Sequence, residues 1–575
     1  MAGEFVVTGQ NGAAPFTLKL HRGDGMCLLA MNWKVGRPPD DFVGFAIDFT
    51  QPDGRHFTLT NRINFSTASG GVDPQTRPTT QSPIQKFRWV HFPRNADLDG
   101  PFQYRVRPAF MNPDDSLRFG EAQQAAVELR RETYPGQLNV TFTRGFMSSQ
   151  AFVDQYLSAG PISTLLPASA SDGPSFTPTH PRAKEALAWM GFEARQCILE
   201  VLDKAIADPA AKVKVVAYDL SERDVIEKLK ALGPRLRIII DDSDDHKEAG
   251  SGENQAADIL SASAGAGYVK RQHMGNLQHN KTIVVESPTQ QVAVCGSTNY
   301  SWRGFFVQSN NAIIVQGASA VAPFSAAFES YWSKTTTGFK RSDSTKWSSL
   351  SLPGIDAQVA FSPHGETTAL LGKVAEDVLQ PGTSSVLFSL AFLAQTGGPI
   401  REAMKKVVED PNIFVYGVSD RRIGGLDLQM PNGNAAPVSP AALVGNLPAP
   451  FSQEPTGFEP SVKPTGTRMH HKFIVIDFEK PTARVYMGSY NFSRPADEDN
   501  GENLLLIKDR RIATSYMVEA LRIFDHYQFR VAQQDAATAA TQLALKKPPR
   551  GPGELPWWDK DYTIGFRIKD RELFA

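Results

Sequence analysis

Cysteine is scarce in this sequence: its 575 residues include three, Cys27, Cys197 and Cys295. Three thiols cannot build the framework of a disulfide-rich secreted protein. A run of about 18 apolar residues is also missing, so no membrane-spanning helix is predicted. The first residues, MAGEFVVTGQNG, lack the basic and apolar stretches of a signal peptide. We therefore expect a cytoplasmic protein, or one that is secreted by a route without a signal peptide.

Net charge is nearly absent as well. Lys and Arg total 60 and Asp and Glu total 61, which gives −1. No global basic field draws the chain to nucleic acid or to an anionic membrane, although a local basic patch is left open. Hydrophobic residues make up 41% and charged residues 21%, as in ordinary globular proteins. The chain is too long to fold around a single hydrophobic core, so two to four domains are expected.

The first part of the chain predicts β structure. Short segments such as FVGFAIDFT and FQYRVRPAF alternate or are rich in aromatics, and turn sequences such as RGDG and QPDGR separate them. We predict an all-β sandwich over residues 1–145. It either braces the rest of the protein or docks a partner, a membrane or a substrate.

The pattern then changes to alternating helices and strands. RAKEALAWMGFEARQCILEVLDKAI predicts a helix, KVKVVAYDL a strand, SERDVIEKLKAL a helix and RLRIIIDD a strand. The same order returns from GETTALLGKVAEDVL to NIFVYGVSD. This predicts an internal duplication of a mixed sheet flanked by helices, with one α/β half at residues 146–348 and the other at 349–575.

Each half reaches a histidine segment of the same plan, QHNKTIVVE in the first and MHHKFIVID in the second. Side chains alternate along a strand, so His279 and Lys281 share one face, as do His470 and Lys472. His471 faces the other way. Each segment therefore projects one imidazole and one ammonium together near the start of a strand.

The acids of these segments, Glu286 and Asp477, fall on the opposite face from the histidines. We expect them to tie the strand end to a neighbour rather than to assist an imidazole. A hairpin-like return follows each strand and ends in a glycine that permits close backbone approach. The residues of the return are Gly296, Ser297 and Asn299 in the first half and Gly488, Ser489 and Asn491 in the second.

Placed face to face, the halves would supply two His, two Lys, two Asn and two Ser, a cationic and donor-rich cradle without metal-ligand spacing. Such a set suits a phosphodiester, because lysines and the polar Asn and Ser side chains can bind phosphoryl oxygens. One histidine can attack phosphorus while the other protonates the leaving oxygen and then activates water or an alcohol. A single histidine before an apolar run is usually structural, but the repeated pattern favours function. No cofactor and no metal are predicted.

These segments resemble the paired H-x-K-x4-D motifs of the phospholipase D superfamily. The second copy matches through His470, Lys472 and Asp477, whereas the first has Glu286 as its acid. The resemblance covers about residues 180–575 and implies a pseudo-two-fold bilobal fold with one active site between the halves. It also implies a phosphohistidine intermediate and chemistry that needs no metal. With both motifs in one chain, a monomer is expected.

A further acid in this superfamily commonly orients a catalytic imidazole. NGENLLLI supplies Glu502, and the matching QSNNAIIV gives Asn310 instead. The two histidines are thus expected to have unequal partners, which supports distinct roles. The sequence does not say which histidine Glu502 meets. The resemblance to the family implies that His279 is the nucleophile and that His470 is the general acid and base.

The superfamily includes enzymes that act on lipids, on nucleic acids and on protein–DNA adducts, and the motif does not choose among them. We expect hydrolysis of glycerophospholipids, or transfer of their phosphatidyl group, with peripheral contact to a membrane surface. The near-zero charge, the 35 Phe residues and an insertion between Arg421 and Arg468 support this. The insertion is either a surface loop or a lid. Its apolar residues, which could touch acyl chains, are Leu426, Leu428, Met430, Leu443, Leu447 and Phe451.

Two alternatives remain open. Basic residues near the motifs could form a rim for a nucleic-acid strand in a metal-independent nuclease; they are Lys270, Arg271, His273, Arg303, Arg468 and Arg494. The chain could instead be a binding module or pseudo-enzyme, although the intact second motif argues against this. The tail, ELPWWDKDYTIGFRIKDRELFA, is expected to pack back on the body of the protein, or else to form an aromatic rim at the substrate entrance.

Overall fold

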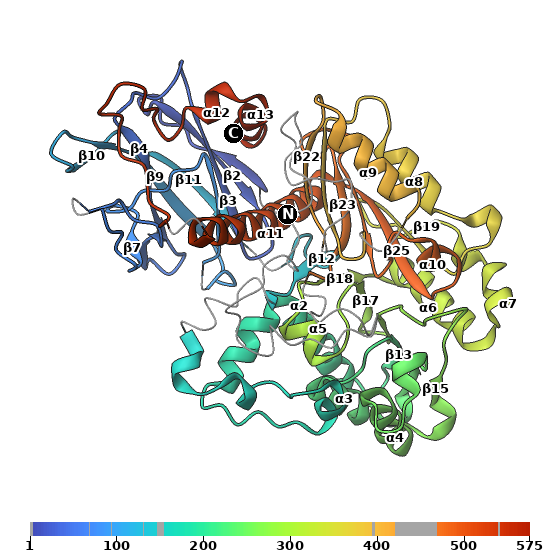
Figure 1. Cartoon of the computed structure of the whole chain (residues 1–575). Coiled ribbons are helices and arrows are strands. Elements are labelled where there is room, and N and C mark those ends of the chain that lie inside the picture. Colours follow the sequence, from blue (N-terminus) through green and yellow to red (C-terminus); the bar gives the residue numbers. More distant parts are fainter. Residues whose placement is uncertain are drawn as a thin grey trace.

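The computed structural model describes residues 4–67, 70–93, 95–129, 132–145, 155–393, 397–419, 469–538 and 541–575. In these residues the chain forms a β-rich N-terminal part and two mixed α/β halves (Figure 1). Among them, no helix is both long enough and apolar enough to cross a bilayer. The insertion at residues 421–468, with its apolar residues and Arg468, lies outside the described part.

The N-terminal part consists of two facing sheets, which confirms the predicted β-rich region. One sheet runs in the order β1 (Val6–Thr8), β2 (Phe16–Arg22), β3 (Cys27–Trp33) and β8 (Arg88–His91). The other contains β10 (Leu117–Phe119), β9 (Pro101–Met111), β4 (Phe42–Thr50) and β5 (His56–Thr58), with β11 (Gln123–Glu128) paired to β9; a small ribbon joins β6 (Thr60–Asn61) to β7 (Arg77–Pro78). In β9, Phe102, Tyr104 and Val106 are buried and alternate with exposed residues. The sheets therefore share one apolar core.

The first α/β half is a seven-stranded mixed sheet with helices. Its strands run in the order β12 (Leu138–Phe142), β18 (Asn311–Gln316), β17 (Gln291–Gly296), β16 (Thr282–Glu286), β13 (Lys212–Ala217), β14 (Leu236–Ile240) and β15 (Val269–Arg271). Its helices are α2 (Ala183–Ala207), α3 (Arg223–Ala231), α4 (Gly252–Ala264), α5 (Trp302–Phe306), α6 (Ala318–Ser333) and α7 (Thr336–Lys340). Helix α3 begins where the Glu222 carboxylate accepts the Val225 backbone N–H at 2.8 Å.

The second half repeats this sheet. Its strands run in the order β19 (Ser348–Ser349), β20 (Asp356–Ser362), β25 (Glu502–Lys508), β24 (Arg484–Gly488), β23 (Lys472–Ile476), β21 (Ser385–Leu390) and β22 (Phe414–Val418). Its helices are α8 (Leu371–Val378), α9 (Pro399–Glu409), α10 (Arg494–Glu498) and α11 (Arg510–Thr538). The motif strand β16 pairs antiparallel with β13, which pairs parallel with β14 on its other side. In the second half β23, β21 and β22 have the same arrangement. The predicted duplication and the mixed sheets are confirmed.

The two halves pack against each other through a shared core. The motif strands are buried along nearly their whole length, as expected for strands covered on both faces. One apolar cluster joins Val294 of β17 and Ile313 of β18 to Met487 of β24 and Leu505 of β25. Helix α11 runs between the second half and the sandwich and contacts both (Figure 1). The histidine motifs are thus carried by strands in the buried interior of the molecule.

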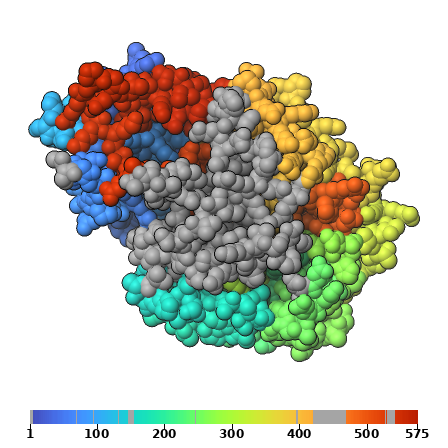
Figure 2. Space-filling view, in the orientation of Figure 1, coloured from blue at the N-terminus to red at the C-terminus, as the bar shows by residue number. Residues whose placement is uncertain are grey.

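Two connections cross the predicted division into residues 1–145, 146–348 and 349–575. Strand β12 pairs antiparallel with β18, so it extends the first α/β sheet rather than the sandwich. The tail, with α12 (Lys560–Thr563) and α13 (Gly565–Phe574), returns to the sandwich, as predicted, and lies beside it in Figures 1 and 2. There the Trp557 indole N–H donates to the Phe42 carbonyl at 2.9 Å, and Trp558 enters the sandwich core. We keep the three-part division as a proposal, with β12 assigned to the first half and the tail to the sandwich.

Candidate active site

The two histidines of the repeated motif meet between the halves. The rings of His279 and His470 have their centroids 6.5 Å apart and are inclined by 70°. His279 and His470 are each 4% exposed, and Lys281 and Lys472 are each 1% exposed. A single group the size of a phosphate can therefore contact both imidazoles.

His279 of the first half is paired with a carboxylate of the second half. Its Nδ1 lies 2.8 Å from Glu502 Oε2, and Glu502 is fully buried. A carboxylate accepts hydrogen bonds, so Nδ1 carries the proton and Nε2 is left with its lone pair. The question that the sequence left open is thereby answered: Glu502 meets His279.

His470 has the reciprocal arrangement with a neutral partner. Its Nδ1 lies 2.8 Å from Asn310 Oδ1, which belongs to the first half. On the other side of the ring, the Lys472 ammonium lies 3.0 Å from Nε2. The amide oxygen of Asn310 can only accept, so Nδ1 of His470 carries the proton. Burial lowers the pKa of His470, so the ring is neutral and its Nε2 is unprotonated. The two imidazoles thus differ in their partners, as expected.

Burial and mutual repulsion weaken the positive charge of the site. Burial is the main cause that lowers the pKa of His279 to about 4, against the attraction of Glu502. Burial, and then the two lysines, hold the pKa of His470 well below its ordinary value. Burial also lowers the pKa of Lys281 to about 8 and depresses that of Lys472 strongly. An anion bound among these groups would reverse the effect, because it favours their charged forms.

The glycine and serine of each return hold the site together. At Gly488 (φ 149°) a Cβ atom would lie 2.2 Å from the Asn503 carbonyl oxygen, and at Gly296 (φ 132°) it would lie 2.5 Å from that of Asn311. Ser297 Oγ donates to Asn310 Oδ1 at 3.0 Å, and Ser489 Oγ donates to Glu502 Oε2 at 2.6 Å. Each serine thus orients the residue that the other half's histidine contacts. A phosphate-binding role for these serines stays a prediction that their hydrogen bonds do not favour.

The two asparagines of the returns differ. The Asn299 amide donates to Asp219 Oδ2 at 2.7 Å, and its Oδ1 has no hydrogen-bond partner in the described part of the chain. Asn491 Oδ1 likewise has no partner among the described residues. Asp219 was not among the sequence-predicted residues, because it lies outside the repeated histidine segments. Phosphate binding by these amides stays a prediction.

The acids of the motifs serve the strands, as their parity predicted. Asp477 Oδ1 accepts the Ser384 backbone N–H at 2.7 Å and its hydroxyl at 3.0 Å. Glu286 forms an ion pair of 2.8 Å with Lys214 on the adjacent strand β13. His471 also points away from the site, where its Nε2 lies 2.9 Å from Glu519 Oε1. All three tie a motif strand to its surroundings.

Two aromatic rings that the sequence did not single out support the lysines. The Lys281 ammonium lies 4.7 Å from the ring centroid of Tyr218, and that of Lys472 lies 5.5 Å from Phe392. The ring of Tyr218 is 4.6 Å from that of His279, and the ring of Phe392 is 6.0 Å from that of His470. One side of the site is therefore lined by a phenol and the other by an apolar ring.

Comparison with known proteins agrees with this geometry. A family model described as "Cardiolipin synthase, PLD-like domain" matches residues 202–332 and 453–524, which include both histidine segments. Through these residues the chain matches the phospholipase D superfamily. Both of its lobes carry the motif, and the mixed α/β sheets match the duplicated fold that the resemblance implied.

Individual relatives match the chain over limited stretches. The phospholipase D of Rickettsia prowazekii is 48% identical over 48 residues, or 8% of this chain and 22% of that protein. The phospholipase D of Rickettsia felis is 46% identical over 48 residues, with the same coverage. The structure of phosphatidylserine synthase from Haemophilus influenzae has 12% identity and a TM-score of 0.38, and covers 61% of this chain and 92% of that one. Polyphosphate kinase from Porphyromonas gingivalis has 11% identity and a TM-score of 0.38, and covers 65% and 53%.

The basic residues expected at a nucleic-acid rim are largely engaged within the protein. Lys270 donates to the Trp332 carbonyl at 2.7 Å. Arg271 donates to the carbonyls of Asp241 and His246 at 2.8 and 2.7 Å. His273 pairs with Asp242 at 2.7 Å, and Arg494 pairs with Glu498 at 3.0 Å. The contacts of Lys270 and Arg271 leave fewer donors for a phosphate backbone than the sequence implied, whereas His273 and Arg494 are exposed in surface ion pairs.

Proposed function

We propose that this protein is a phosphodiesterase of the phospholipase D type that acts through a phosphohistidine on His279. The observation that carries the proposal is the pair of imidazoles 6.5 Å apart, one held by a carboxylate and the other by an amide. This difference suits a division of labour between a nucleophile and a general acid and base. The chemistry is expected to need no metal and no cofactor.

In the first step the Nε2 lone pair of His279 attacks phosphorus. A P–N bond forms, the bond from phosphorus to the leaving alcohol breaks, and the leaving oxygen takes a proton from Nε2 of His470. His470 must be protonated for this step, and the negative charge of the bound phosphodiester favours that form. Glu502 stabilises the cationic ring of His279, and Lys281 and Lys472 neutralise the phosphoryl oxygens.

In the second step water, or an alcohol, attacks the same phosphorus atom. His470, now neutral, takes the proton of the attacking O–H group as the new P–O bond forms. The P–N bond breaks and its electron pair returns to Nε2 of His279. The product is a phosphatidic acid with water, and a phosphatidyl alcohol with an alcohol.

A glycerophospholipid is the substrate that we favour. The Rickettsia relatives are named phospholipase D, and the matching family model is described by cardiolipin synthase. Phe392 beside His470 gives the site an apolar wall, and the engaged basic residues weaken the nuclease alternative. Peripheral contact with a membrane surface and a monomeric state remain predictions.

The test uses the purified protein with EDTA present. It is given phosphatidylcholine and ethanol in one reaction and single-stranded DNA in another. We expect phosphatidylethanol and free choline from the first, and intact DNA in the second. Cut DNA without phosphatidylethanol would select the nuclease alternative, and activity that EDTA abolishes would contradict the metal-free mechanism. Unchanged rates in His279→Ala and His470→Ala would contradict an enzymatic role for the site and favour a binding module.

A further inference from the structure

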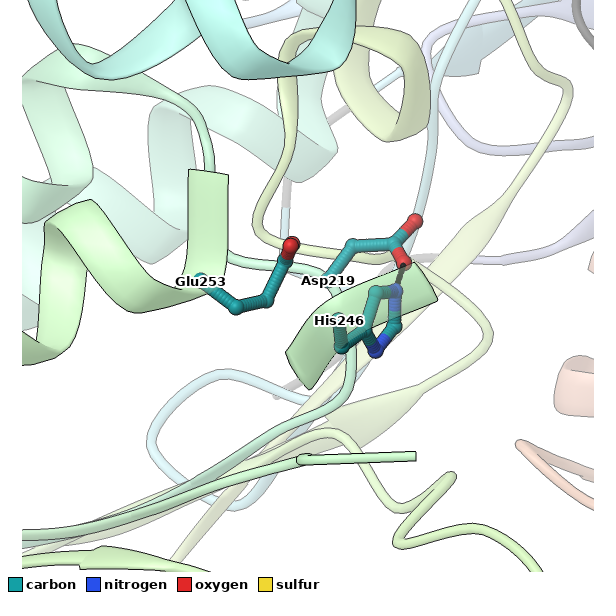
Figure 3. A group of neighbouring side chains, drawn as sticks. All are labelled: Asp219, His246 and Glu253. Atoms are coloured by element: carbon teal, nitrogen blue, oxygen red, sulfur yellow. Dashed lines mark ion pairs between the residues drawn. The ribbon is translucent and has the colours of Figure 1, made fainter. Parts of the chain in front are cut away.

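A second histidine network lies beside the first motif and is not part of the mechanism above. His246, in the short helix η6 (Asp244–Lys247), has both ring nitrogens bound to carboxylates, and Figure 3 shows its contact with Asp219. Its Nε2 lies 3.1 Å from Asp219 Oδ1, and its Nδ1 lies 2.8 Å from Asp241 Oδ2. A ring that contacts acceptors at both nitrogens is held as a doubly protonated imidazolium.

Each of the two carboxylates holds a different end of the first motif. Asp219 Oδ2 accepts from the side-chain amide of Asn299, in the return after β17, at 2.7 Å. Asp241 Oδ1 accepts from the backbone N–H of Gln278 at 2.6 Å. Gln278 immediately precedes His279. His246 therefore links the entry of the motif strand to the end of its return.

The same imidazole also supports the aromatic wall of the site. The ring of Tyr218 lies 4.5 Å from that of His246 and 4.6 Å from that of His279. The Lys281 ammonium lies above this ring at 4.7 Å. A change at His246 would thus be transmitted by contact to both His279 and Lys281.

We propose that His246 is a positioning residue, which clamps Asp219 and Asp241 so that His279, Lys281 and Asn299 are held in their working places. This inference rests on the proposed function. The two halves then differ, because the described structure has Phe392 beside His470 where the first half has Tyr218 and His246. The first half would be the fixed side of the site, on which the nucleophile is held.

The cluster could also be taken for a metal site, since atoms of Asp219, His246 and Glu253 lie within 4.8 Å of one another (Figure 3). The hydrogen bonds argue otherwise. Glu253 Oε1 accepts the Leu220 backbone N–H at 3.0 Å, and both nitrogens of His246 are engaged. Burial lowers the pKa of His246, but the hydrogen bonds to Asp219 and Asp241 outweigh it and raise the pKa to about 11. The imidazolium is itself the cation of this cluster.

The test compares His246→Ala and His246→Gln with His273→Ala. His273 is the matched control, because it also pairs with an aspartate nearby, at 2.7 Å, yet its side chain is exposed and, among the described residues, it has no hydrogen bond or ion pair with a motif residue. For both His246 variants we expect kcat on phosphatidylcholine to fall by about 10- to 100-fold, with a smaller change in KM, because the reacting groups are misplaced. Imidazole added to His246→Ala should restore part of kcat. The control should keep the wild-type values.

Two measurements do not depend on turnover. Calorimetric titration with tungstate, a phosphate mimic, should show weaker binding in the His246 variants than in His273→Ala. Nitrogen-15 NMR of histidine-labelled wild type should show both nitrogens of His246 protonated at pH 8. If wild type binds tungstate but turns over no phosphodiester, the proposed function fails while these two measurements still decide on His246.

Three results would overturn the positioning role. One is wild-type kcat and tungstate affinity in a folded His246 variant. Another is a neutral His246 in the NMR spectrum at pH 8, which needs no variant to fold. The third is activity that Zn²⁺ or Mn²⁺ stimulates in wild type and not in His246→Ala, which would make the cluster a metal site.

Discussion

His279 Nδ1 and Glu502 Oε2 lie 2.8 Å apart although 223 residues separate them in the chain. The reciprocal contact, between His470 and Asn310, spans 160 residues. Each half therefore supplies the group that orients the other half's histidine. Neither half alone holds a histidine with its partner, which explains why the site forms only where the two meet.

Replacing Glu502 by Gln should lower kcat by about 100-fold or more, because an amide orients the ring of His279 but does not stabilise its cationic form. The measurement is kcat on phosphatidylcholine at fixed pH. Glu519→Gln is the matched control, since Glu519 makes the same kind of buried contact with His471, at 2.9 Å, away from the site. We expect that variant to unfold at a lower temperature and to keep its kcat. Equal losses in the two variants would contradict the role of Glu502.

Binding of tungstate should take up protons. In the free site the pKa of Lys281 is lowered to about 8 and that of His470 lies well below 6.5, and a bound anion raises both. The complex thus holds more protons than the free protein, and the affinity falls as the pH rises through the pKa of free Lys281. At pH 8 the uptake from Lys281 alone should be about half a proton.

Calorimetry in buffers of different ionisation enthalpy measures this uptake. Lys281→Met should reduce it at pH 8, whereas Lys270→Met should not. Lys270 is the matched control, because burial also lowers its pKa but its ammonium bonds to the Trp332 carbonyl. Binding without proton uptake would show that the free site is already fully charged.

Gly488→Ala should destabilise the protein by about 2 kcal/mol or more, because φ is 149° and the new Cβ atom would meet the Asn503 carbonyl oxygen at 2.2 Å. Gly372→Ala, in helix α8, is the opposite case. Nothing lies within 4 Å of its Cβ position, so that variant should be as stable as wild type or up to about 1 kcal/mol more stable. Denaturant unfolding measures both changes. A stable Gly488→Ala protein would mean that the return does not need this close approach.

The sequence was sufficient for features that follow from strand parity and repetition. A side-chain period of two residues predicts that His279 and Lys281 share one face and that His471 points to the opposite face. The same period predicts the strand-end role of Asp477. The duplicated sheets follow from the repeated order of elements. These inferences hold because the motif strands are buried on both faces, which leaves their register little freedom.

Contacts between segments far apart in the sequence could not be predicted. Which histidine Glu502 meets depends on how two halves pack, and no local pattern encodes that. Asp219 lies more than twenty residues before Asp241 and His246 in the first half, and the second half has Phe392 in place of a repeat. Ser297 and Ser489 were expected to face the substrate, yet their hydroxyls bond to Asn310 and Glu502.

The central claim is that His279 attacks the same phosphorus atom that His470 serves as acid and base. Its most direct test mixes His470→Ala rapidly with phosphatidyl-p-nitrophenol, whose leaving group needs no acid, and quenches in alkali before mass spectrometry of the peptides. We predict a burst of about one equivalent of p-nitrophenolate and a phosphatidyl group on His279 that water removes slowly. His279→Ala should give neither. A phosphatidyl group on His470 in His279→Ala, or a burst without an adduct on His279, would contradict the account.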